Sequence, residues 1–183
     1  MRNLASIVAL LLAACGANPV SYSTPVGINL KVKSSDVSNS AITDDKAITT
    51  ESGNPYGAFV NDAKAKLGKA PSRIEIDNLT LTLGAQSTGV TALEQVYTGD
   101  VDVALITNDT NSTYDVGHVI GPTGVGPVNV DVAYASDQVS AADFAKILSG
   151  SFKVVLRGPA AATFQSKGAE ANLDLTFTFA AFE

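Results

Sequence analysis

The chain has 183 residues, a length that favours one domain with a sizeable core over two domains. Its 18 acidic residues outnumber its 12 basic residues, and the net charge of −6 argues against nucleic acid as a partner, because phosphates would be repelled. A single cysteine excludes a framework of intramolecular disulfides, so packing and hydrogen bonds must stabilise the fold.

The first fourteen residues have the features of an export signal. Arg2 gives a short positive start, residues 4–12 are apolar, and the small residues Ala13 and Ala14 follow. A transmembrane helix needs about 20 apolar residues, so this stretch is too short to be one. An ordinary cleaved signal would leave a lone reactive thiol in an exported protein, which is unusual.

The motif Leu12-Ala13-Ala14-Cys15 resembles the lipobox of bacterial lipoproteins, and the resemblance covers residues 1–15 only. It implies that a signal peptide of residues 1–14 is recognised through Leu12, Ala13 and Ala14 and removed, and that Cys15 then carries the lipid. Each buried methylene contributes about 0.8 kcal/mol, so two or three acyl chains would hold the protein on a membrane without spanning it.

The residue after the cysteine bears on the location. In enteric lipoproteins an Asp at this place favours retention at the inner membrane, whereas this chain has Gly16. By the same resemblance we expect an outer-membrane anchor, with the domain facing the periplasm or the cell surface. Loss of residues 1–14 would leave 11 basic and 18 acidic residues, a surface that anionic head groups would repel.

Residues 15–25 are predicted to be a lipidated tether. Residues 16–25 lack periodicity and contain two prolines, and ten extended residues reach about 33 Å at most. Residues 26–183 would then form a single domain close to its membrane.

Strands are predicted wherever apolar and polar residues alternate. Within residues 74–83 the phase of the alternation slips by one at Asp77-Asn78, which a β-bulge would explain. Apolar residues on one face only are typical of antiparallel sheets. The alternating apolar positions are Val26/Ile28/Leu30/Val32, Ile74/Ile76 with Leu79/Leu81/Leu83, Val101/Val103/Leu105, Val128/Val130/Val132/Tyr134, Phe152/Val154/Leu156 and Leu173/Leu175/Phe177/Phe179.

Two short helices interrupt the strands. Asn54 can cap a helix that starts at Pro55 and ends before Gly68. Ser140 with Asp143 resembles a capping pair, and this second helix would stop at Gly150. Residues 34–53 are polar, and we expect a long loop there with one short strand at residues 47–50.

These elements predict an all-β fold: an antiparallel β-sandwich, immunoglobulin-like or jelly-roll-like, with two short connector helices. A C-terminal alternation that ends near Phe182 is similar to the closing strand of outer-membrane barrels. Glu183 comes last, however, and aromatic residues are few, so we interpret this segment as the last strand of the sandwich.

One loop offers oxygen ligands at alternate positions. Asp109, Asn111, Thr113 and Asp115 have the spacing at which a loop can surround Ca²⁺. The pattern departs from the EF-hand, and the same residue types favour turns through hydrogen bonds to the backbone. A turn is the preferred interpretation, Ca²⁺ remains the alternative, and no other cofactor is indicated.

Catalytic motifs are poorly represented. His118 is the only histidine and lies in a loop-like, glycine-flanked stretch without a nucleophile motif, so a hydrolase centred on it has little support. The carboxylate pairs Asp44-Asp45 and Asp100/Asp102 suit solvated turns or strands better than a glycosidase cleft. Absence of Trp also weakens a glycan site built on aromatic stacking.

We therefore expect a non-enzymatic envelope lipoprotein whose sandwich serves as a structural or protein-interaction module, with another envelope protein as its partner. The alternative is a sandwich that binds a ligand, either Ca²⁺ or a glycan.

Overall fold

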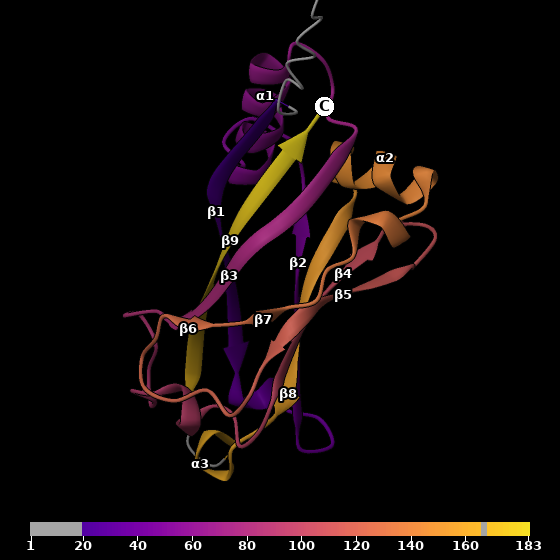
Figure 1. The fold of residues 1–183 in the computed structure, drawn as a ribbon. Coiled ribbons are helices and arrows are strands. Elements are labelled where there is room, and N and C mark those ends of the chain that lie inside the picture. Colours follow the sequence, from indigo (N-terminus) through magenta and orange to yellow (C-terminus); the bar gives the residue numbers. More distant parts are fainter. Residues whose placement is uncertain (1–19, 166–167) are drawn as a thin grey trace, which may run out of the picture.

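The computed structural model describes residues 20–165 and 168–183, and these form two antiparallel sheets that pack face to face (Figure 1). The four-stranded sheet has the order β1 (Ser21–Lys33), β9 (Glu170–Phe182), β3 (Arg73–Leu83) and β6 (Val128–Asn129). The five-stranded sheet has the order β2 (Ala41–Ile48), β8 (Phe152–Pro159), β4 (Val101–Thr107), β5 (Thr113–Val119) and β7 (Asp131–Val132). The all-β sandwich prediction is confirmed.

Alternation along the strands decides which side chains enter the core. On β1 the four predicted positions from Val26 to Val32 are buried, while the residues between them are exposed. The predicted bulge is also present, because the pairing of β3 with β9 shifts register between Ile76 and Asn78. Each large apolar side chain buried in this way stabilises the fold by about 1.5–3 kcal/mol.

Helix α1 (Pro55–Leu67) closes one end of the sandwich, next to the start of β1 and the end of β9 (Figure 1). The Asn54 side chain accepts a hydrogen bond from the backbone N–H of Tyr56, and Gly68 ends the helix in the left-handed conformation, as predicted. The ring of Tyr56 packs edge-on against Phe152 of β8 and Phe179 of β9, with centroids 5.1 and 5.3 Å away. One helix residue therefore contacts both sheets.

The other helices are α2 (Ala141–Ser149), which has the predicted Ser140 cap and Gly150 stop, and α3 (Ala162–Gln165), which was not predicted. A four-residue helix is too short to leave a periodic signal in the sequence. Among the helices of residues 20–165 and 168–183, none combines the length and the apolar character needed to cross a bilayer.

Three predictions about loops and strands are wrong. Strand β1 starts at Ser21, inside the expected tether, because residues 21–25 pair with the end of β9; Pro25 is accommodated because β1 is an edge strand. Residues 41–48, assigned mainly to a loop, form β2 against β8 although only Ile42 and Ile48 are buried. Cross-strand pairing outweighed their polar composition.

The third error concerns residues 128–134, which do not form one strand. They cross between the sheets: β6 pairs with β3, and β7 pairs with β5. The N–H of Val130 donates to the carbonyl of Leu79 in one sheet, and the N–H of Ala133 donates to that of Val116 in the other. The alternation of apolar and polar residues in this segment indicates extended backbone, but it does not indicate that the paired strand changes from β3 to β5.

Two buried tyrosines give a matched test of the core. The Tyr56 hydroxyl donates to the carbonyl of Ile147 at 3.0 Å, whereas the hydroxyl of Tyr97, which is 2% exposed, has no partner among the described residues. We expect Tyr56→Phe to lower the free energy of unfolding by about 0.5–1.5 kcal/mol, and Tyr97→Phe to leave it unchanged or to raise it by up to about 1 kcal/mol. Urea denaturation of both variants measures the difference, and equal destabilisation would contradict the assignment.

Candidate functional site

The loop considered for Ca²⁺ is the turn of the β4–β5 hairpin. Asp109 and Asn111 adopt left-handed backbone conformations in the turn, and Thr113 and Asp115 lie on β5. The Asp115 carboxylate accepts the backbone N–H of Gly117 at 3.0 Å. Within residues 20–165 and 168–183, no group of three or more His, Cys, Asp or Glu residues is placed to hold a metal ion.

The hydroxyls around this turn are directed to Asp143 on α2. Its carboxylate, in a residue only 4% exposed, accepts hydrogen bonds from Thr110 (2.7 Å), Tyr114 (2.8 Å), Ser140 (3.0 Å) and Thr107 (3.1 Å). These donors, Thr110 first, hold the pKa of Asp143 well below its usual range and outweigh the opposing effect of desolvation. Asp143 thus fastens the hairpin to the helix.

Lys146, one turn further along α2, completes this fastening. Its ammonium group donates to the carbonyl of Asn108 at 2.5 Å and to the hydroxyl of Thr110 at 3.0 Å. The sequence predicted Asp143 only as a helix-capping residue. Its contact with the hairpin could not be foreseen, because it joins residues 29 to 36 positions apart in the chain.

The histidine lies on a strand and not in a loop. His118 is half-buried on β5, where it pairs in register with Asp102 of β4 and Asp131 of β7. None of the described residues forms a hydrogen bond with its imidazole. The glycines on either side had suggested a loop, but Gly117 lies within β5, beside the bulge at which Val116 is inserted opposite Val103 and Ala104, and Gly121 follows the strand.

The carboxylate pairs have separate surroundings. Asp44 accepts the backbone N–H of Lys31 at 3.1 Å and so joins β2 to β1, and burial raises its pKa. Asp45 forms an ion pair with Lys153 at 3.6 Å. Asp100 and Asp102 line a pocket of about 500 Å³ that also contains Arg157.

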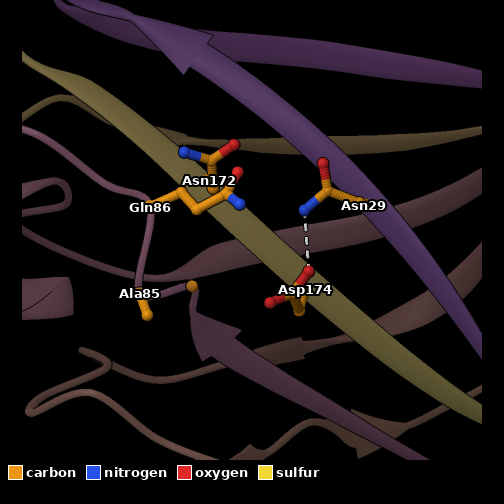
Figure 2. A pocket seen from close by; sticks show the side chains of 6 residues that line it. Asn29, Ala85, Gln86, Asn172 and Asp174 are labelled. Atoms are coloured by element: carbon orange, nitrogen blue, oxygen red, sulfur yellow. Dashed lines mark hydrogen bonds between the residues drawn. The ribbon is translucent and has the colours of Figure 1, made fainter.

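A second polar pocket lies on the outer face of the four-stranded sheet, and we call it the amide pocket. It has a volume of about 330 Å³ and is lined by residues from β1, β9 and the turn after β3 (Figure 2). Three of its side chains are carboxamides and one is a carboxylate. The lining residues are Asn29, Gly84, Ala85, Gln86, Asn172 and Asp174.

One wall of the amide pocket is a fixed pair. Asn29 and Asp174 face each other across the β1–β9 ladder, and the Asn29 amide donates to Asp174 Oδ1 at 2.7 Å. Within the described chain this is the only hydrogen bond to the Asp174 carboxylate. The second carboxylate oxygen therefore remains an acceptor.

The opposite wall is a turn held against β9 by its backbone. The N–H of Gly84 donates to the carbonyl of Asn172 at 2.8 Å, and the N–H of Asn172 donates to the hydroxyl of Ser87 at 3.0 Å. Asn172 itself is only 8% exposed, yet no described residue hydrogen-bonds to its side-chain amide. The side chain of Gln86, also without such a partner in the described residues, extends over β9 toward the same hollow (Figure 2).

Sequence reasoning missed this pocket. Asn29 and Asp174 appeared only as the polar positions of alternating strands, and Gln86 as part of a turn, so no local motif joined them. The predicted lipidation residues Leu12, Ala13, Ala14 and Cys15 lie outside the described residues. No protein-family model and no curated protein sequence matches the chain.

The hydrogen bonds that Asp143 accepts from the surrounding hydroxyls predict that the stability of the fold depends on pH. The pKa of Asp143 is lowered from its ordinary value of 3.8, so its contribution to stability is complete above that pH and is lost as the pH falls below it. We expect Asp143→Asn to lower the melting temperature clearly at pH 7 and progressively less from pH 4 to pH 2. Thermal melts of both proteins across this range test this, and a difference independent of pH would contradict a charged Asp143. Asp137→Asn, on an exposed turn, serves as the control.

Proposed function

We propose that this protein is a lipid-anchored envelope protein, held at a membrane through Cys15, whose β-sandwich is a non-enzymatic interaction module. The observation that carries the proposal is the motif Leu12-Ala13-Ala14-Cys15 behind an apolar stretch. With Gly16 as the next residue, we propose the outer membrane as the location.

The short distance between Cys15 and β1 supports the proposal. Six residue steps separate Cys15 from Ser21, and a chain of this length reaches about 20 Å at most whatever its conformation. An acylated Cys15 would therefore keep the adjacent end of the sandwich close to the lipid surface.

The charge at that end is compatible with a membrane. Lys64, Lys66, Lys69 and Arg73 are exposed at the end of α1 and the start of β3, and Arg73 aligns with Phe182 and Ser21 in neighbouring strands. Lys69 and Arg73 form ion pairs with Glu183 and Glu75, whereas Lys64 and Lys66 have no ion pair among the described residues. Repulsion from anionic head groups, expected from the net charge, is thus weakest where the chain approaches the anchor.

The roles of the polar residues favour binding over catalysis. Asp143 is committed to holding the β4–β5 hairpin, Asp44 joins two strands, and Asp45 pairs with Lys153. The amide pocket, in contrast, presents donors and acceptors that can bind a polar ligand, and this pocket favours ligand binding as the second candidate function.

The anchor can be tested by expressing the full-length protein in a bacterium with radiolabelled palmitate. We expect the protein to be labelled and to sediment with membranes, in the outer-membrane fraction of a density gradient, and Cys15→Ser to abolish the label. A Cys15→Ser/Ser35→Cys double variant, which places the only thiol at an exposed site of the domain, should remain unlabelled. An unlabelled, soluble wild-type protein would refute the proposal.

A further inference from the structure

The amide pocket contains a mostly buried polar side chain that keeps its contact with solvent. Proteins avoid leaving a buried amide without a hydrogen-bond partner, because an unpaired one is costly. Asn172 is only 8% exposed and lines the pocket, no described residue hydrogen-bonds to its side-chain amide, and that amide is not among the fully buried unpaired groups of the described residues. Its hydrogen-bond partners must come from the pocket side, from solvent or from a ligand.

The charge of the pocket lining limits which ligands can bind there. Asp174 is the only charged residue in the lining, which disfavours phosphates and carboxylates. Lys31, which pairs in register with Asn172, is held by Glu170 at 2.6 Å and so does not offset the negative charge. A hard cation is also a poor fit, because Ca²⁺ takes 6–8 oxygen ligands and here a single carboxylate has already accepted the Asn29 amide.

Hydrogen-bonding capacity points to hydroxyl groups. A carboxamide presents a donor and an acceptor side by side, and a carboxylate presents acceptors only. A pair of adjacent hydroxyls, each of which donates and accepts, matches this combination, with Asp174 Oδ2 as acceptor and the amides of Asn29, Gln86 and Asn172 as donors and acceptors. The volume of about 330 Å³ lies at the lower end of the range of small-molecule sites, about 300–1,000 Å³.

The position of the pocket on the sheet disfavours an extended peptide. Peptides that add to a sheet use free backbone groups at its edge, whereas β9, the floor of the pocket, is paired on both sides, with β1 and β3. Beyond Asp174 the outer face of the sheet continues with the polar residues Thr176 and Thr80.

We propose that the amide pocket binds a neutral saccharide, with a vicinal pair of hydroxyls donating to Asp174 and exchanging hydrogen bonds with Asn29, Asn172 and Gln86. No aromatic residue lines the pocket, so hydrogen bonds supply the affinity and the expected Kd is on the order of 1 mM. The inference takes the domain to be a binding module, as proposed above, and does not depend on the anchor.

Gly84 provides a way to narrow the pocket beside Asp174 without removing a polar group. A Cβ at this position would lie 3.0 Å from Asp174 Oδ2 and 3.3 Å from the Cβ of Asn172, and its backbone angles do not require glycine. Gly27 lies on the same outer face, and a Cβ there would meet nothing within 4 Å. Gly84→Ala and Gly27→Ala are thus a matched pair of test and control.

The test is a titration of the full-length Cys15→Ser protein, labelled with ¹⁵N, with maltotriose and with the trimer of N-acetylglucosamine, followed through the side-chain NH₂ signals of Asn29, Gln86 and Asn172. At least one saccharide should shift these signals at concentrations of up to about 20 mM. This upper limit of the titration is well above the expected Kd. Asp174→Asn should weaken binding about tenfold or more, because a hydrogen bond to a charged group is lost. Gly84→Ala should weaken binding, because its methyl group would occupy space beside Asp174 Oδ2, and Gly27→Ala should not change it.

Several results would overturn the saccharide assignment. These are no shift with either trimer, shifts that Asp174→Asn and Gly84→Ala leave unchanged, or shifts produced instead by Ca²⁺ or by a neutral tetra-alanine peptide. If Gly84→Ala does not fold, Asp174→Asn still decides the outcome. Because the titration uses a protein without Cys15, its result is independent of palmitate labelling, and failure of one proposal is distinguishable from failure of the other.

Discussion

Strand β9 sets the geometry on which the rest of the domain depends, because it pairs with β1 on one side and with β3 on the other. Its inward residues Leu173, Leu175, Phe177 and Phe179 lie in the core, and its outward residues Asn172 and Asp174 lie in the amide pocket. Side chains alternate with a period of two, so a slip of one residue would expose the four apolar side chains to water. The energy that holds the core in register therefore also positions the pocket.

The aromatic contacts of Tyr56 fix the end of the sandwich where the chain leaves toward Cys15. From there the strands lead away: Asn29 is eight residues beyond Ser21 on β1, a distance of about 26 Å at the rise of a strand. Anchoring at Cys15 would thus place α1 beside the lipid and the amide pocket well away from it, on a face open to large molecules. The basic residues near α1 and the carboxylate of the amide pocket are likewise separated along the direction of β1.

Much of this architecture could be predicted from local patterns. The alternation at Val26 to Val32, the phase slip at Asp77 and the caps at Asn54 and Ser140 each have a local physical cause, and each was correct. Strand β2 and the crossing at residues 128–134 were missed, because pairing with a distant strand decided them. The pocket was missed for the same reason: Asn29 and Asp174 are 145 positions apart and become neighbours only through β-sheet register.

A site built from hydrogen bonds alone binds weakly, and anchoring changes what weak binding can achieve. Copies held on one membrane by Cys15 would meet a repeating polysaccharide as an array, so that binding of one copy raises the effective concentration of the chain for its neighbours. A millimolar site would then be sufficient for retention of a polymer, while single sugars would exchange freely. The proposed lipid and the proposed saccharide site would act together, since the anchor would supply the avidity that a pocket without aromatic rings lacks.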